Sequence, residues 1–164
     1  MASTYLSRTF TSGNRKTWTL STWVKRSSLA GATSSIFFTG SGAGVPRGGI
    51  VFADDQTIDI SMNPTGNAWQ ACRTNAVYRD VSAWYHILLA IDTTQATDSN
   101  RLKLYVNGIQ QTFSSPSYPS PNQDLPVNLA TPHAIGADVS PASFFDGSMA
   151  DVYFIDGLAY DAST

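Results

Sequence analysis

The chain has 164 residues, of which 42% are hydrophobic and 13% are charged, and its formal net charge is −2. This length suits one domain with a sizeable core, whereas the charged share is about half that of an ordinary globular protein. The small negative charge gives no electrostatic basis for binding nucleic acid or an anionic membrane, and no segment is long and apolar enough to predict membrane insertion.

The acidic residues and the single cysteine indicate the fold class and the compartment in which the protein folds. All twelve acidic residues are aspartates, which favour turns, and the chain has no glutamate, which favours helices. Cys72 is the only cysteine, so no intrachain disulfide can form, and we expect it to be a small buried apolar residue. The N-terminus lacks an apolar run of signal-peptide length. We therefore expect a strand-rich protein that folds in a reducing compartment.

The first half of the chain alternates short strand patterns with turns. In 17–26, Trp18, Leu20 and Val24 share one face and Trp23 lies on the other. We expect a flexible Gly-rich loop at 40–49. The remaining expected strands are 34–39, a hairpin of 50–53 and 57–62, and two short strands at 67–73 and 76–80.

The second half contains the clearest strand signal. The apolar run 84–92 is followed by the alternating segment 102–106 and by Asn107-Gly108, a strong turn signal, after which 109–113 begins another strand. A Pro-rich and Ser-rich connection over the surface is expected at 114–132, and two closing strands at 134–137 and 144–157. No helical periodicity of useful length occurs. The pattern predicts an all-β fold, an antiparallel β-sandwich of the jelly-roll type.

Three blocks give the chain a resemblance to a known family. They are 18–25, then Trp84-Tyr85-His86 with 102–108, and Ile135-Gly136 with 145–154. In order and spacing they resemble the concanavalin A-like lectin/glucanase superfamily, and within it the laminin-G-like and pentraxin-like jelly rolls. Residues 5–9, 18–26 and 154–159 are similar to domains in bacteriophage tail and other virion structural proteins.

The resemblance implies a function, which we state as expectations. We expect residues 1–164 to form a single jelly-roll domain, or the N-terminal domain of a longer virion protein. It would be a non-enzymatic structural or attachment domain of a tail fibre, appendage or capsid decoration, folded in the host bacterial cytoplasm and located in the virion. Its expected partners are other virion proteins, further copies in a homo-oligomer such as a trimer, and a host-surface glycan. The alternative is a free carbohydrate-binding, lectin-like module.

A polysaccharide hydrolase is a second alternative, but the chain lacks the residues that such enzymes use for catalysis. Related glucanases use paired glutamates, which this chain lacks, and two aspartates would have to replace them. The nearest candidates, Asp54, Asp55 and Asp59, fit a turn and a strand edge. His86 fits a structural position packed beside Trp84, and no Gly-x-Ser-x-Gly elbow accompanies the histidines. We therefore predict no catalytic residues.

Two kinds of ligand site remain open. Related modules hold calcium in clusters of loop oxygens, so calcium is a possible cofactor, but the candidate donors form no compact motif and its ligands cannot be assigned. These donors are Asp54, Asp55, Asp92, Asp98, Asn100, Asp138 and Asp146. Sugar binding needs exposed aromatic rings near loops. We predict Trp69, Tyr78 and Tyr118 as ligand-binding residues, with Tyr160 also near a loop, and expect Trp18, Trp23 and Trp84 in the core. Any function is expected in the loops 40–49 and 114–132.

Overall fold

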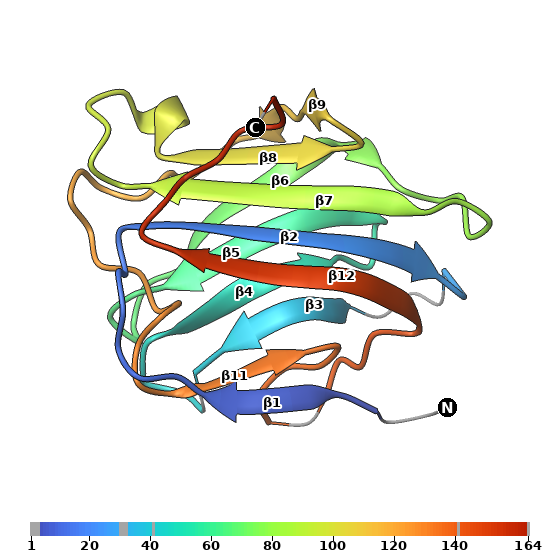
Figure 1. Cartoon of the computed structure of the whole chain (residues 1–164), viewed down its shortest axis with the longest axis horizontal. Coiled ribbons are helices and arrows are strands. Elements are labelled where there is room, and N and C mark those ends of the chain that lie inside the picture. Colours follow the sequence, from blue (N-terminus) through green and yellow to red (C-terminus); the bar gives the residue numbers. More distant parts are fainter. Residues whose placement is uncertain (1–3, 30–32, 41, 141, 164) are drawn as a thin grey trace.

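A computed structural model shows two antiparallel sheets packed face to face (Figure 1). It describes residues 4–29, 33–40, 42–140 and 142–163. The seven-stranded sheet has the order β1 (Leu6–Thr9), β11 (Pro132–Ile135), β3 (Ser34–Thr39), β4 (Arg47–Phe52), β5 (Thr57–Asn63), β6 (Gln70–Val77) and β10 (Phe113–Ser114). The five-stranded sheet has the order β12 (Gly147–Asp156), β2 (Thr17–Arg26), β7 (Tyr85–Asp92), β8 (Leu102–Val106) and β9 (Ile109–Gln110).

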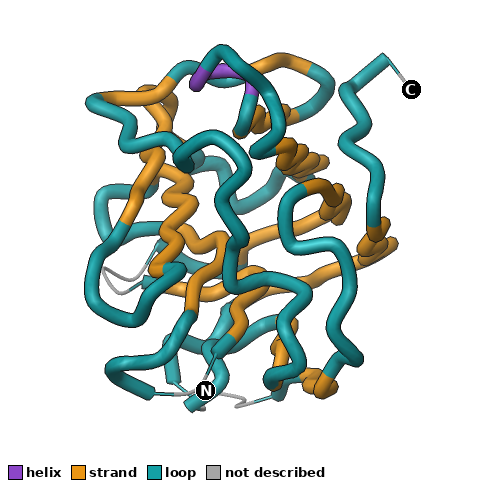
Figure 2. Tube along the Cα trace, turned by 90° about the vertical axis from the view of Figure 1, so that its left-hand side faces the viewer, coloured by secondary structure: helices purple, strands orange, loops and turns teal. Residues whose placement is uncertain are grey.

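The predicted all-β sandwich is confirmed. Loops make up much of the rest of the chain, as the trace coloured by secondary structure shows (Figure 2). Among the described residues the one helical element is the 3₁₀ turn Asp98–Asn100. No helix in this part of the chain has the length and hydropathy needed to cross a bilayer.

The core forms between the two sheets from side chains that alternate along each strand. In β2, Trp18, Leu20 and Val24 point inward and are at most 1% exposed, whereas Trp23 points outward and is 40% exposed. This alternation confirms the prediction for one face and corrects the expectation that Trp23 belongs to the core. Cys72 lies in β6 against Ile60 and is buried, as expected.

Trp84 is not a core residue either. It immediately precedes β7 and is 41% exposed, because the inward position at this end of the strand is taken by Tyr85, which is 9% exposed. His86, two residues further along, lies on the same outer face as Trp84. Its imidazole lies against Trp23 on the neighbouring strand β2, with ring centroids 4.9 Å apart.

Several strand boundaries differ from the prediction. Strand β4 begins at Arg47, inside the expected Gly-rich loop, and the two strands expected at 67–73 and 76–80 form the single strand β6. The polar residue Thr74 continues β6 because its hydroxyl accepts a hydrogen bond from the Ile58 N–H and donates one to the Ala76 carbonyl. Strand β1 was not predicted, since its four exposed residues carry no apolar pattern.

The segment after β8 leaves one sheet and joins the other. The strand expected at 109–113 is divided between β9, in the five-stranded sheet, and β10, in the seven-stranded sheet. The Pro-rich connection that follows lies only partly on the surface. It sends Leu125 and Val127 into the core, where both are fully buried. Apolar burial therefore anchors a segment that looks like a surface loop in the sequence.

Candidate functional site

A small hollow forms on the outer face of the seven-stranded sheet, where β3 ends and β4 begins. Its volume is about 180 Å³. Its lining residues come from the end of β3, the Gly-rich loop, the start of β4, the residue before β6 and the loop after β11. They are Phe38, Gly40, Gly42, Arg47, Trp69, Asp138, Val139 and Ser140. The structure thus brings together the Gly-rich loop and Trp69, two features that the sequence singled out separately.

Strand register places the two largest side chains of this hollow together. Arg47 pairs with Asn63 on β5, and the next pair along, Met62 with Gln70, places Trp69 beside Asn63. Because alternate residues share a face, Arg47, Asn63 and Trp69 all lie on the outer side. The Arg47 guanidinium carbon reaches across to lie 5.1 Å from the centre of the Trp69 ring, a cation–π contact. The indole is 46% exposed.

A hydrogen-bond donor and a hydrogen-bond acceptor lie near the Trp69 ring. The Nε atom of Arg47 is buried and has no hydrogen-bond partner among the described residues. Asp138 uses its Oδ1 atom to accept a hydrogen bond of 3.0 Å from the Ala142 N–H, which fixes the carboxylate in its loop. The hollow therefore combines an exposed aromatic ring, a strong donor and a strong acceptor. The sequence named Asp138 only as a possible calcium donor and covered Arg47 only as part of the loop 40–49. It did not link either residue to Trp69, because contacts across strands leave no local motif.

Glycine is required where the Gly-rich loop turns into the hollow. Gly40 has φ +88°, and a Cβ atom there would collide with the Pro46 carbonyl oxygen. Gly66, with φ +84°, would likewise collide with the Gly44 backbone. The loop and the 64–66 turn therefore approach each other more closely than side chains would allow.

The other two predicted sugar-binding residues do not join Trp69. Tyr78 is 6% exposed, its hydroxyl donates a hydrogen bond of 2.9 Å to Gln111 Oε1, and burial raises its pKa to about 12. Its ring has no face open for stacking, so its prediction as a ligand-binding residue is wrong. Tyr118 is partly buried and packs edge-on against Phe113, with ring centroids 6.3 Å apart.

Two of the three aspartates considered for hydrolysis, Asp55 and Asp59, are held in structural contacts. Arg73 forms ion pairs of 3.3 Å with both Asp55 and Asp59, joining the β4–β5 hairpin to β6. Hydrogen bonds from Thr57 lower the pKa of Asp55, and Arg73 adds to this shift. The two carboxylates thus share one cation.

The possible calcium donors are spread over several loops. No group of three or more His, Cys, Asp or Glu side chains among the described residues is close enough to hold a metal ion. Asp92 accepts hydrogen bonds from Thr94 and Gln95, and Asp146 accepts one from Ser28. These carboxylates organise the loops that carry them.

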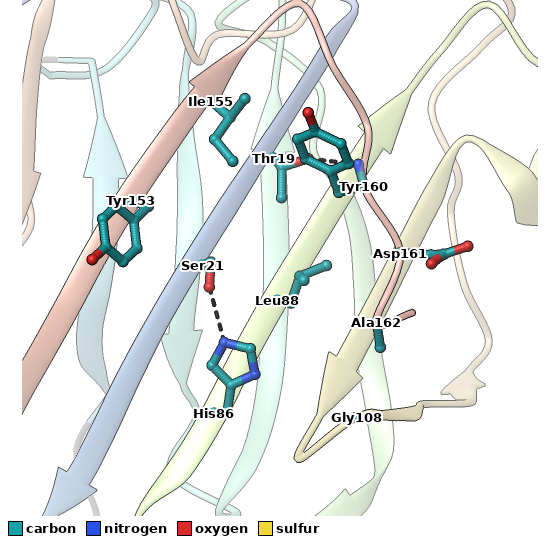
Figure 3. A pocket seen from close by; sticks show the side chains of 10 residues that line it. All are labelled: Thr19, Ser21, His86, Leu88, Gly108, Tyr153, Ile155, Tyr160, Asp161 and Ala162. Carbon is teal, nitrogen blue, oxygen red and sulfur yellow. Dashed lines mark hydrogen bonds between the residues drawn. The ribbon is translucent and has the colours of Figure 1, made fainter. Parts of the chain in front are cut away.

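A second and larger hollow lies on the opposite side of the sandwich. It is a groove of about 360 Å³ on the outer face of the five-stranded sheet, and Figure 3 shows the residues that line it. The sequence did not predict it. Its lining includes His86, which the sequence assigned to packing, and Tyr160, which it placed near a loop.

The two packed antiparallel sheets define a jelly-roll sandwich. The family model described as the concanavalin A-like lectin/glucanases superfamily matches residues 2–159, and the chain belongs to this superfamily. No curated protein matches the chain.

Solved structures with the same fold include domains of an arabinanase, a phage tailspike and a sialidase. Domain 4 of the arabinanase AbnA from Geobacillus stearothermophilus, solved with arabinotriose, has TM-score 0.65 and 21% identity over 93% of this chain and 65% of that one. Tailspike protein 2 of the Escherichia coli O157:H7 bacteriophage CAB120 has TM-score 0.64 and 14% identity over 96% of this chain and 22% of that one. The CBM40 of a Ruminococcus gnavus sialidase has TM-score 0.61 and 13% identity over 99% of this chain and 96% of that one. At these identities the likeness shows the fold alone.

Proposed function

We propose that this chain is a non-enzymatic attachment domain of a bacteriophage virion that binds a host-surface glycan at the Trp69 hollow. The observation that carries the proposal is the exposed Trp69 ring, with the unpartnered Arg47 Nε and the fixed Asp138 carboxylate around it. A sugar presents hydroxyl groups and an apolar C–H face. The hollow offers a complementary surface for each.

Each group has a defined task in such a complex. The indole face of Trp69 packs against the C–H face of a pyranose or furanose ring. The guanidinium of Arg47 donates hydrogen bonds to hydroxyl oxygens, and the carboxylate of Asp138 accepts them from hydroxyl hydrogens. Since opposite charges line one small hollow, a neutral polar ring suits it better than an ion. A volume of about 180 Å³ suits contact with a single ring of a longer glycan.

The virion assignment has separate support. The N-terminal and closing sequence blocks resemble those of phage structural proteins, and the CAB120 tailspike contains a domain of the same fold. In this role the domain joins other virion proteins, forms a homo-oligomer, for which a trimer is our preferred state, and reaches the particle from the host cytoplasm. The chain has no glutamate, the residue that related glucanases use for catalysis. This fits attachment to a glycan better than its hydrolysis.

A glycan array with matched tryptophan variants tests the binding site. We expect saturable binding of neutral glycans that Trp69→Ala weakens and Trp84→Ala retains. The two indoles are similarly exposed, at 46% and 41%, so both variants should fold. Arg47→Met should weaken binding, because it removes the donors and keeps the aliphatic stem. An array without binding, or equal losses in both tryptophan variants, would refute this site.

Particle analysis tests the virion assignment separately. The chain should co-purify with phage particles and occupy a symmetric position in an image reconstruction. Its absence from purified particles, together with normal glycan binding, would favour the free lectin-like module instead.

A further inference from the structure

The groove on the five-stranded sheet is a basin with a floor and distinct walls. Ser21 of β2 and Leu88 of β7 form the floor (Figure 3). Tyr153 stands on one side on β12, and Tyr160 stands across from it on the C-terminal segment. The remaining lining residues are Thr19, His86, Gly108, Ile155, Asp161 and Ala162.

A β-bulge creates the Tyr153 wall. Ala150 pairs with Trp23, but Tyr153 pairs with Ser21, so β12 holds one residue more than β2 between these pairs. Asp151 takes φ +50° at this point. Without the extra residue, Tyr153 would pair with Leu20 and point into the core, since a one-residue shift exchanges the faces of a strand. The bulge therefore turns an aromatic ring outward, where it is 60% exposed.

The Thr19 hydroxyl group holds the opposite wall in place. Thr19 Oγ1 donates a hydrogen bond of 2.8 Å to the Leu158 carbonyl and accepts one of 2.9 Å from the Tyr160 N–H. Thr19 itself is 1% exposed. The C-terminal segment is thereby held across the sheet, with Tyr160 and Ala162 at the groove.

The polar end of the groove is oriented in advance. Ser21 Oγ and His86 Nε2 are hydrogen-bonded at 2.9 Å, and the imidazole also lies against the Trp23 ring. The backbone N–H of His86 is bonded to Asn107 Oδ1 at 2.8 Å. These contacts fix the ring, and its second nitrogen is turned away from Ser21, towards the side where Gly108 lies (Figure 3). The imidazole thus presents its second nitrogen to the Gly108 side of the groove.

We propose that this groove is a second ligand site and that it takes a neutral sugar ring. No lysine or arginine is among its ten lining residues, so the side chains that usually pair with carboxylate, sulfate or phosphate groups are missing from the lining. Tyr153 and Leu88 offer apolar surface to C–H groups, whereas His86 and Ser21 offer hydrogen bonds to hydroxyls. The volume of about 360 Å³ falls within the usual range of small-molecule sites, about 300–1,000 Å³.

The position of the groove has a functional consequence. It lies on the outer face of one sheet, and the Trp69 hollow lies on the outer face of the other. A single copy of the chain would then contact two sugar rings on opposite faces. Such a domain can bridge two glycan chains, which raises the overall avidity when both sites are occupied.

Nuclear magnetic resonance titration of the ¹⁵N-labelled chain tests the second site. The probes are neutral trisaccharides of glucose, galactose, mannose and arabinose, and a sialylated and a uronic-acid trisaccharide as charged controls. We expect a neutral probe to shift the amides of Ser21, His86 and Tyr160. Tyr153→Ala should weaken this binding about tenfold, Tyr153→Phe should retain most of it, and Trp69→Ala should leave it unchanged. The high exposure of Tyr153 means that its variants should fold, and an unchanged melting temperature checks this.

The outcomes separate this inference from the proposed function. Binding lost in Trp69→Ala but kept in Tyr153→Ala overturns the second site and supports the first. Loss only in Tyr153→Ala supports the groove and refutes the hollow. A preference of the groove for the charged probes would overturn the neutral-sugar assignment. A fall in the molar mass of Tyr153→Ala, measured by light scattering, without any sugar-dependent shift in the wild type, would identify the groove as a contact between copies and also overturn the proposal.

Discussion

Phe10 lies flat against His133, with ring centroids 4.0 Å apart and ring planes inclined by only 10°. The imidazole also accepts a hydrogen bond of 3.0 Å from the Asn128 N–H at Nε2, while its Nδ1 lies 2.8 Å from the Thr131 carbonyl oxygen. A backbone N–H can only donate, so Nε2 must be unprotonated. His133 is therefore a buried neutral histidine that joins the N-terminal segment to the sheet at β11.

This contact predicts that the fold is sensitive to mild acid. Burial lowers the pKa of His133 below its ordinary value of 6.5, an effect that the Thr131 carbonyl opposes in part. The unfolded chain then binds the proton more readily. The stability contributed by the neutral ring is complete above about pH 6.5 and is lost as the pH falls towards the lower pKa of the folded state, by at most about 1.4 kcal/mol per pH unit.

Thermal unfolding between pH 7.5 and pH 5 measures this loss. The variant His133→Gln keeps an acceptor for Asn128 but cannot titrate in this range. We expect the melting temperature of the wild type to fall more steeply with acid than that of the variant. Parallel curves for the two proteins would show that His133 does not carry the effect.

We predict contrasting stability effects for substitutions at two of the tryptophans, Trp18 and Trp84. Trp18 is fully buried and packs against Phe154, with ring centroids 5.7 Å apart. Trp18→Ala should lower the free energy of unfolding by about 3–5 kcal/mol, since it leaves a large cavity. Trp84→Ala, at an exposed position, should change it by about 0.5 kcal/mol or less. Urea denaturation measures both.

A third variant refines the comparison of the tryptophans. The indole nitrogen of Trp18 is buried and has no hydrogen-bond partner among the described residues. Trp18→Phe removes this unsatisfied donor along with part of the ring volume, so it should cost clearly less than Trp18→Ala. A large loss in Trp84→Ala would mean that the exposed indole has a structural role that its position does not indicate.

Period-two alternation explains how much of the fold was predictable. Strands β2 and β3 match their predicted bounds because β2 has a clearly alternating apolar face and β3 is a short apolar run that ends just before Gly40. At strand ends and bulges, alternation predicts less reliably on which side of the sheet a residue lies. Trp84 was misplaced because Tyr85 takes the inward position, and the outward turn of Tyr153 depends on an extra residue that alternation alone does not reveal.

The candidate sites depend even more on contacts between distant residues. Trp69 and the Gly-rich loop were predicted from local composition, since exposed aromatics and glycines near loops stand out in a sequence. Arg47 and Asp138 could not be linked to Trp69 in this way, because strand register and the loop after β11 bring them together. Tyr78 shows the opposite error, since its position near a turn suggested exposure although the ring is buried.

Arg101 helps to hold the Pro-rich connection in place. Its side chain is mostly buried, and its guanidinium donates hydrogen bonds to the carbonyls of Gln95, Ala96 and Pro119, at 2.8, 2.6 and 2.9 Å. A lysine cannot reproduce this planar fork. Arg101→Lys should therefore cost about 2 kcal/mol of unfolding free energy, since it leaves buried carbonyls without donors.

The same variant should loosen the connection locally. Limited proteolysis should cut residues 114–128 faster in Arg101→Lys than in the wild type, and Arg79→Lys, at an exposed position, should behave like the wild type. Unchanged cleavage in Arg101→Lys would mean that the buried Leu125 and Val127 are sufficient to hold the segment.

We predict that the Cys72 thiol reacts only when the chain unfolds. The residue is 1% exposed in β6, and burial raises its pKa to about 12, with a further contribution from the carboxylate of Asp59. Because the thiolate is the reactive form, the native protein at pH 8 should resist iodoacetamide. In 6 M guanidinium chloride the thiol should be labelled at the rate of an ordinary cysteine. Intact-mass spectrometry over time measures both rates, and rapid labelling under native conditions would contradict the prediction.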